Sequence, residues 1–429
     1  EREVSVAKQT FKMSEMEGLS FASVDEALQG QIAGLDIVFN SGDLGSGTQM
    51  RLRGTSTITG NQEPLIVVND NIFEMPDGED FDFSTANEEK FAQLLTVNPE
   101  DIESIEVLKD ASASAIWGSR GSNGVIMIKT KRGSRGKTRL NYSFRFKDKW
   151  IPNGLNLLNG DDYTMMLKEA YFNPSQSDHY AAVDELNYKI DFAEYENYNE
   201  NTDWVDAVSK HGYTNEHNIS LTGGGEKATF RISGGYREET GQVIGQYGQR
   251  FTTRLNLDYF VSHRIKVMAD FAFTYNKNRR NTMDLLYNSL LMMPNMSIYK
   301  QDIYGNNTDE YYAMLDWENK NTLQSVMNGK KNPIAVGNLA EYYTENYSVS
   351  PQITLEYNLL GLEDNETRLL YRGMVNLNAS TASGVEGILA PSTTAITPFF
   401  KSVFAASPSS SFCVAHGNAI SHFIVQIPL

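Results

Sequence analysis

The stretch Asn98–Gly133 reads NPEDIESIEVLKDASASAIWGSRGSNGVIMIKTKRG and carries several local structural signals in one compact unit. Asn98 is a good helix N-cap, and the following Pro99-Glu100-Asp101 places a proline and two acids where a short helix begins. The apolar residues between Ile102 and Leu108 then indicate a strand. The first half of the stretch therefore predicts a helical turn followed by a strand.

The second half predicts a helix of small residues, a glycine turn and another strand. Residues 111–116 are small and tolerate a helix, and they run into Gly118, Gly121 and Gly124, which allow a tight turn or a positive φ. Residues 125–131 alternate as a strand does.

This stretch resembles the plug-domain signature of TonB-linked outer-membrane receptors, in the starch-utilisation C (SusC)/RagA-like branch found in Bacteroidetes. The matching runs are Asn98–Asp110, Ala115–Gly121, Asn123–Val125 and Lys129–Gly133. The resemblance implies an α+β plug domain followed by antiparallel transmembrane β-barrel strands. It also implies a location in the bacterial outer membrane, with the plug accessible from the periplasm.

The chain is expected to divide into four parts. Residues 1–20 are an N-terminal segment, residues 21–133 the plug domain and residues 134–378 the N-terminal part of the barrel. Residues 379–429 form an anomalous tail in which only two residues, Glu386 and Lys401, are charged. Alternation also stops there, which suggests a frameshift or assembly artefact. Because the chain starts at Glu1 rather than at a methionine, we interpret it as a mature or excised fragment.

The first half of the expected plug also shows helix and strand signals. Val24, Leu28 and Ile32 lie at helical spacing behind a Ser23 cap, and Gly34 follows as a stop. Strands are expected at residues 35–39, 50–53 and 65–68.

Two features after residue 68 depart from a simple plug pattern. The family usually has an Asp-Gly turn after the last of these strands, but here the sequence is Asn69-Asp70-Asn71. The acidic insertion Glu74–Lys90 is interpreted as a solvated surface loop. A calcium site is the alternative, but the spacing matches no twelve-residue calcium loop.

Beyond Gly133 the pattern becomes strictly alternating. In residues 138–147, leucine and aromatic residues alternate with polar and charged ones, as required of a barrel strand between lipid and a polar lumen. Residues 227–236, 250–260 and 263–275 repeat this pattern. Short turns and long connections alternate, which predicts a periplasmic rim and an extracellular rim. Roughly six to eight strands are expected, an incomplete barrel compared with the about 22 strands that the resemblance implies.

Composition excludes several functions. The net charge of −17 and the isoelectric point near 4.9 argue against a nucleic-acid partner. Cys413 is the only cysteine, so disulfides and thiolate metal sites are not expected. The histidines, including His211 and His217, form no ligand motif, and residues 118–124 lack the Gly-Lys-Ser/Thr ending of a phosphate loop. We therefore expect no catalytic, cofactor or metal site, and no enzyme activity.

Charged residues of the signature are the candidate functional site. Glu103, Glu106, Lys109, Asp110 and Arg120 bring both signs together, and we predict that some of them latch the plug to the barrel and loosen during transport. The alternative is that they only cap and solvate plug helices. The signature also contains Trp117, Gly118, Gly121 and Gly124.

The resemblance implies a set of partners. Glu3-Val4-Ser5-Val6 is similar to the segment that such receptors offer to TonB, which ExbB/ExbD supply with energy; an ordinary frayed terminus is the alternative. A SusD-like surface lipoprotein would close over the receptor in the outer-membrane lipid. The expected activity is active import of an oligosaccharide or, less commonly in the family, a peptide.

A soluble or surface carbohydrate-binding β-sandwich is the main alternative. In that case Trp117, Trp150 and Trp204 would stack on sugar rings, and two sheets would pack their apolar faces together. A passive porin or an adhesin is disfavoured because the first third of the chain would fill the lumen.

Overall fold

The computed structural model describes residues 8–13, 24, 28–39, 44, 48–52, 64–72, 97–109, 115–152, 154, 156–173, 176, 195–279, 284–312, 330–360, 368–377, 379–388 and 419–426. Four features singled out in the sequence lie outside these residues. They are the segment Glu3–Val6, Asp110, the acidic insertion Glu74–Lys90 and Cys413. Within the described parts of the chain, no helix has the length and apolar character needed to cross a membrane.

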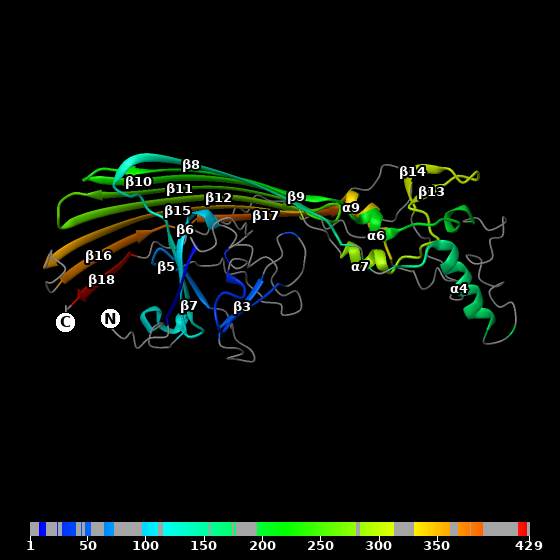
Figure 1. The fold of residues 1–429 in the computed structure, drawn as a ribbon, viewed down its shortest axis with the longest axis horizontal. Coiled ribbons are helices and arrows are strands. Elements are labelled where there is room, and N and C mark those ends of the chain that lie inside the picture. Colours follow the sequence, from blue (N-terminus) through cyan, green and yellow to red (C-terminus); the bar gives the residue numbers. More distant parts are fainter. Residues whose placement is uncertain are drawn as a thin grey trace.

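The N-terminal domain is built on a five-stranded sheet (Figure 1). Its strands, in spatial order, are β1 (Lys8–Lys12), β6 (Ile102–Leu108), β7 (Val125–Thr130), β4 (Leu65–Val68) and β5 (Asn71–Ile72). β4 and β7 are parallel, and the other neighbours are antiparallel. β2 (Leu35–Phe39) and β3 (Thr48–Leu52) form a separate antiparallel pair. The strands expected in this part of the chain are therefore present.

Local capping follows the expected pattern at one helix and departs from it at the next. Asn98 caps the 3-10 helix η3 (Pro99–Asp101), and its side chain accepts a hydrogen bond from the Glu100 amide at 3.1 Å. Of the helix expected at residues 111–116, only Ala115 and Ile116 are described, and they begin the 3-10 segment η4 (Ala115–Gly121). Gly118 has φ +62°, which interrupts regular helix and gives two short turns instead. Residues 111–114 lie outside the described parts.

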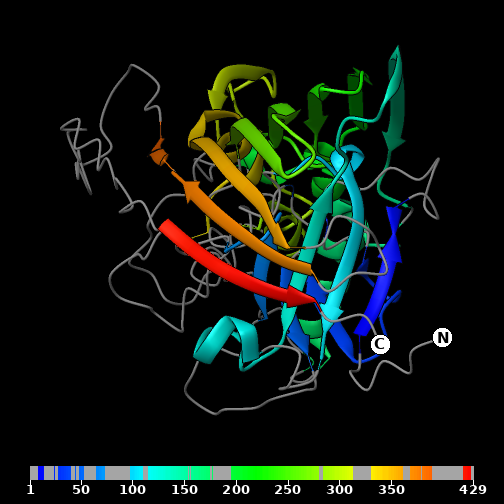
Figure 2. The same ribbon diagram turned by 90° about the vertical axis from the view of Figure 1, so that its left-hand side faces the viewer.

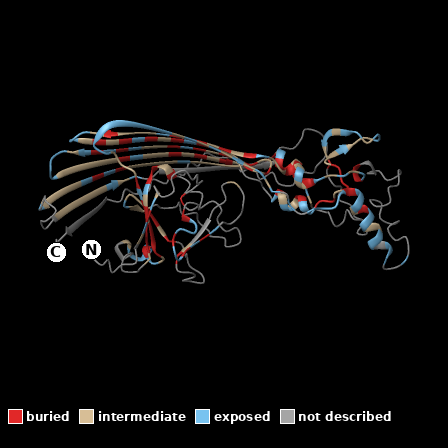
Figure 3. Ribbon diagram, viewed as in Figure 1, coloured by how far each residue is buried: buried red, intermediate tan, exposed pale blue. Residues whose placement is uncertain are grey.

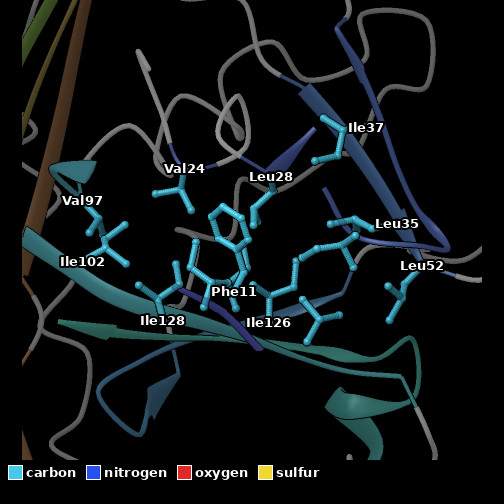
Figure 4. Close-up of a cluster of buried hydrophobic side chains, with 14 residues drawn as sticks. Phe11, Val24, Leu28, Leu35, Ile37, Leu52, Val97, Ile102, Ile126 and Ile128 are labelled. Carbon is cyan, nitrogen blue, oxygen red and sulfur yellow. The ribbon is translucent and has the colours of Figure 1, made fainter. Parts of the chain in front are cut away.

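Apolar residues cover both faces of the N-terminal sheet. Alternate residues of β7 separate the two clusters: Ile126 and Ile128 join one, and Val125 joins the other. Figure 4 shows the larger cluster, where the expected helix residues Val24 and Leu28 pack over the sheet. Its members are Phe11, Val24, Leu28, Ile32, Leu35, Ile37, Leu52, Ile66, Val97, Ile102, Ile105, Val107, Ile126 and Ile128. The smaller cluster contains Val67, Leu108 and Val125, with Trp117 packed against it.

A long curved sheet, called the wall here, follows the N-terminal domain. Its described part has nine strands, seven of them within residues 134–378, where six to eight were expected, and two beyond residue 378. The strands are β8 (Gly136–Lys149), β9 (Gly212–Gly224), β10 (Ala228–Thr240), β11 (Tyr247–Phe260), β12 (Ile265–Arg279), β15 (Ala340–Leu360), β16 (Arg368–Asn376), β17 (Ala379–Ile388) and β18 (Ala419–Gln426). Neighbours are antiparallel, and the sheet runs from β8 to β18 without closing on itself. Figures 1 and 2 show the N-terminal domain on its concave side.

Burial in the wall is the reverse of that in a soluble sheet. On β10, Arg231 and Ser233 are 7% and 5% exposed, whereas Ile232 and Tyr236 are 42% and 37% exposed. β11 and β12 continue the alternation, which appears as stripes in Figure 3. Among the described residues no second sheet covers the apolar outer face. The wall is therefore barrel sheet, and the β-sandwich alternative is wrong.

The two ends of the wall differ as the sequence predicts. At one end, short turns at residues 225–227 and 261–264 connect the strands. At the other end, residues 150–211 and 280–339 contain most of the helices (Figure 1). These helices and strands are α4 (Gly160–Phe172), η6 (Tyr195–Tyr198), α6 (Trp204–Val208), α7 (Leu285–Leu290), β13 (Tyr299–Gln301), β14 (Asn307–Tyr311) and α9 (Pro333–Leu339). We call this end the loop rim.

The long connections share a hydrophobic core of their own. Trp204 is buried there, and its indole nitrogen donates to the Met293 carbonyl at 2.9 Å. Trp150 is exposed and Trp117 lies against the N-terminal sheet, so the three tryptophans considered as a sugar platform are in different places. Tyr198 and Tyr312 meet edge to face inside the core, 6.0 Å apart.

Part of the tail continues the wall. β16 and β17 both pair with β15, and together they follow it from end to end. The break between them lies opposite Pro351, a residue without a backbone N–H to donate, although its carbonyl accepts from the Leu377 amide at 3.1 Å. The sheet extends beyond residue 378 through β17 and β18, which pair with β15 and β16.

Candidate functional site

The residues predicted as a latch lie in several environments. Glu106 accepts a hydrogen bond from Lys129 at 2.8 Å, and Lys109 donates to Gln9 at 2.9 Å and to the Ala33 carbonyl. All of these partners belong to the N-terminal domain, so these contacts hold its own sheet together. Glu103, Gly118 and Arg120 are exposed.

The signature glycines shape the N-terminal domain. Gly124 has φ +95°, and a Cβ atom there would lie 2.2 Å from a methyl group of Leu52 and 3.2 Å from the Leu108 carbonyl oxygen. Only glycine fits this close approach without strain. Gly121 is buried one turn earlier.

Neighbours of the predicted residues make the contacts with the wall. Asp101 is buried, and its carboxylate lies 3.1 Å from the guanidinium of the buried wall residue Arg231. Asn98, the cap of η3, donates to the side chain of Asn218 at 2.7 Å. One short turn at the start of β6 thus supplies both a charged and a neutral contact.

A glycine on the wall leaves room for the Asn98 side chain. Gly235 on β10 lies opposite this side chain, and a Cβ atom there would be 2.4 Å from the Asn98 amide nitrogen and 2.7 Å from the Thr252 hydroxyl. The adjacent Gly234 has only an ordinary contact, with Ile219 at 3.5 Å. Because position 235 has no side chain, the wall has space there for Asn98 of the N-terminal domain.

Arg132, at the end of the signature, joins the N-terminal domain to two neighbouring wall strands. Its guanidinium lies 2.5 Å from Asp258 on β11 and 2.9 Å from Asp270 on β12. Burial alone lowers the pKa of Arg132, but its hydrogen bonds and charge interactions with both carboxylates outweigh burial, and the net shift is upward. The arginine is a permanent cation between two acids.

A chain of charges leads from this contact region along the wall. Glu100 pairs with Arg145 on β8, and Arg145 lies 3.8 Å from Glu216 on β9. Glu216 lies 3.5 Å from Arg237 on β10, which pairs with Glu239 at 2.8 Å. These alternating charges line the concave face toward the loop rim.

The β4–β5 turn makes a separate contact with the far side of the wall. Asn69 and Asp70 have φ values of +50° and +65°, the conformation of a two-residue type I′ turn. Reciprocal hydrogen bonds to Thr130, at 2.8 and 3.0 Å, hold the Asn69 side chain. Gln352 donates to the Asn69 carbonyl at 3.3 Å, and Arg372 pairs with Asp70 at 2.9 Å. In place of the family's Asp-Gly turn, Asn69 thus contacts the wall through its backbone carbonyl and Asp70 through its side chain.

Ion pairs and amide hydrogen bonds connect the N-terminal domain to the wall. Within the described residues, no three His, Cys, Asp or Glu side chains are grouped as a metal site requires. Several of these contacts are buried, and removing one partner of a buried pair is costly.

Sequence reasoning found the region but not the pairs. Asp101 and Arg132 lie inside the recognised stretch, and the alternation of the wall strands indicated that Arg231, Asp258 and Asp270 face inward. The partners are more than 120 residues apart in sequence, as in the Asp101–Arg231 pair with a separation of 130. The sequence alone does not show which residues of the N-terminal domain lie opposite which residues of the wall.

Comparison with known proteins supports this arrangement. The family described as "TonB-dependent Receptor Plug Domain" matches residues 1–125. The TonB-dependent receptor SusC of Bacteroides thetaiotaomicron is 30% identical over 316 residues, which cover 71% of this chain and 28% of that protein. The TonB-dependent receptor P3 of Formosa agariphila is 29% identical over 329 residues, covering 73% of this chain and 29% of that protein. The chain thus spans less than a third of the length of these relatives.

Solved structures share the fold. The RagAB peptide importer in its "open-open" state matches with a TM-score of 0.67 and 20% identity, over 89% of this chain and 42% of that chain. Its "closed-closed" state matches with a TM-score of 0.66 and 21% identity, over the same shares. The chain therefore belongs to the SusC/RagA-like TonB-dependent receptors of the bacterial outer membrane, and it comprises the plug domain, which faces the periplasm, with part of the barrel wall.

Proposed function

We propose that this chain is the plug and part of the wall of an active importer in which TonB displaces the plug to admit a nutrient. The observation that carries this proposal is the buried polar interface between plug and wall. Apolar packing would be enough to hold a plug that never moves, because buried ion pairs are often no more stabilising than apolar groups of similar size. Polar contacts can instead exchange with water when the plug moves.

The path from the N-terminus to this interface is short. β1, which begins at Lys8, is the edge strand of the plug sheet and pairs only with β6 in that sheet. Lys12 at its end pairs with Ser104, three residues from the Asp101 contact. A force applied before Lys8 would therefore reach the contact between Asp101 and the wall through one strand pair. Residues Glu3–Val6, immediately before β1, are the proposed TonB-coupling segment.

The proposed cargo is an oligosaccharide, with a peptide as the second candidate. The relationship to a SusC receptor supports a two-component importer with a SusD-like surface lipoprotein, and ExbB/ExbD would energise TonB. The second candidate is kept because the RagAB structures with the same fold are of a peptide importer. Uptake by cells carrying the complete receptor and its lipoprotein, tested with matched oligosaccharides and peptides, separates the two.

The Asp101→Asn variant tests the ion pair between Asp101 and Arg231. It leaves Arg231 buried without its acid, which should cost about 3–5 kcal/mol, whereas Glu103→Gln changes an exposed carboxylate two residues away and should cost about 0–1 kcal/mol. Hydrogen exchange of β6 and β7 in the complete receptor should accelerate in Asp101→Asn alone. Equal exchange in wild type and both variants would show that this pair does not hold the plug.

The Gly235→Ala variant tests the hydrogen bond between Asn98 and Asn218. Its new methyl group displaces Asn98 from Asn218, which should cost about 1–3 kcal/mol for a lost buried hydrogen bond. Gly234→Ala is the matched control, since its methyl group makes only an ordinary contact. Limited proteolysis of receptor in membranes should cleave the plug faster only in Gly235→Ala. Identical cleavage rates in both variants would show that the space at Gly235 is not needed to hold the plug.

The Val4→Pro variant tests coupling. Proline removes a donor needed when an extended segment adds to a partner's sheet, so binding of the TonB C-terminal domain should fall about tenfold or more and uptake should stop. Ser5→Ala should retain both. Normal TonB binding by Val4→Pro would place the coupling segment elsewhere.

A further inference from the structure

The outer face of the wall carries three ordered rows of side chains near the loop rim. Strand pairing sets Tyr236, Phe251, Tyr275 and Tyr347 side by side in the first row, and the rings of Tyr275 and Tyr347 are 4.9 Å apart. The second row contains Glu238, Gln249, Lys277 and Glu345, and the third contains Thr240, Tyr247, Arg279 and Tyr343. An aromatic row is thus followed, toward the loop rim, by a charged row and then by an arginine between two tyrosines.

Lipid is what this face meets. β10, β11, β12 and β15 are interior strands of the wall, so further strands, which add at the edges of a sheet, cannot cover it. The plug occupies the opposite face. Aromatic rows mark the membrane–water boundary of outer-membrane barrels, and long loops mark the extracellular side. The second and third rows therefore lie at the level of the outer-leaflet headgroups.

One hydrogen-bond donor of Arg279 has no acceptor in the described part of the chain. One of its terminal nitrogens donates to the Ala340 carbonyl at 3.1 Å, and its Nε is buried without an acceptor. In the described part of the chain, no carboxylate pairs with it. The two acids of the neighbouring row are already engaged, because Glu345 pairs with Lys277 at 2.7 Å and Glu238 accepts from Tyr247 at 3.3 Å.

The charge of Arg279 acts on a second cation, Lys210. Lys210, just before β9, is partly buried, and its backbone amide is fixed by the Gln242 carbonyl at 2.8 Å. Burial and the charge of Arg279 lower the pKa of Lys210. Among the described residues Lys210, too, has no acidic partner. Two neighbouring cations without an acid favour an anionic ligand.

We propose that Arg279, assisted by Lys210, binds the phosphate of a phosphorylated glycolipid headgroup in the outer leaflet. The guanidinium fork matches phosphate oxygens. The flanking tyrosines supply the amphipathic rings typical of this depth in the membrane. The proposal depends on the membrane location of the receptor and not on the proposed transport cycle.

The test uses the complete receptor in phosphatidylcholine vesicles, titrated with phosphate-bearing lipid A and followed by thermal unfolding. Arg279→Gln should bind the lipid about fivefold or more weakly than wild type, because it loses a charge-assisted contact. Arg264→Gln is the matched control: Arg264 also donates to a backbone carbonyl, that of Leu359 at 3.2 Å, but lies at the opposite rim. Arg279→Lys should keep part of the affinity, which separates loss of charge from misfolding.

Three outcomes would overturn the proposal. Wild-type affinity in Arg279→Gln, or equal losses in Arg279→Gln and Arg264→Gln, would show that no specific site exists there. Equal binding of lipid A stripped of its phosphates would remove phosphate as the recognised group. Equal stabilisation by inorganic phosphate alone would assign the cations to a soluble anion. A failure of nutrient uptake changes none of these readouts, so the two proposals can fail separately.

Discussion

Polar side chains on the concave face of the wall constrain everything else in this structure. Arg231, Asp258 and Asp270 are each less than one tenth exposed, and such groups are costly to bury unless they are paired. The plug supplies part of the pairing through Asp101 and Arg132. A wall with an apolar outer face and a charged inner face is therefore matched to a plug whose sheet ends in charged residues.

The same constraint explains why the plug signature is so compact. The start of β6 and the end of β7 are adjacent antiparallel strand ends, and the Lys131 amide donates to the Asp101 carbonyl at 2.7 Å. Residues about thirty positions apart in sequence thus reach the wall from one place. Between them, η4 and the turn in which the Gly124 amide donates to the Gly121 carbonyl at 3.0 Å lead the chain into β7. The stretch is a structural unit first, and its charged ends provide the contacts.

Most of the fold could be predicted from the sequence, because period-two alternation and turn residues are local signals. The strand of residues 125–130, the Asn98 cap and the two kinds of wall connection were found this way. The helix expected at residues 111–116 falls mostly outside the described residues, and η4, which begins at Ala115, is broken into two short turns at Gly118, where φ is +62°. The folded core of the long connections was not foreseen, since residues such as Trp204 and Met293 come from separate loops.

The contact residues were harder to predict, for a physical reason. Charge alone selected Glu106 and Lys109, whose hydrogen-bonded partners Lys129 and Gln9 lie within the plug. Which charges cross between domains depends on the angle at which the plug meets the wall, and no local pattern encodes that angle. Gly235 illustrates this limit: as a glycine within a strand it signals a close approach, but not the identity of the approaching residue.

The most direct test of this account is a nitroxide scan of residues 229–236 on β10, with the complete receptor in a lipid bilayer. The account predicts that spin labels at positions 230, 232 and 236 collide with oxygen dissolved in the lipid, while labels at 229, 231 and 233 are shielded by the plug. A scan with the opposite phase, or with no period of two, would contradict the assignment of the aromatic face to lipid and of the charged face to the plug.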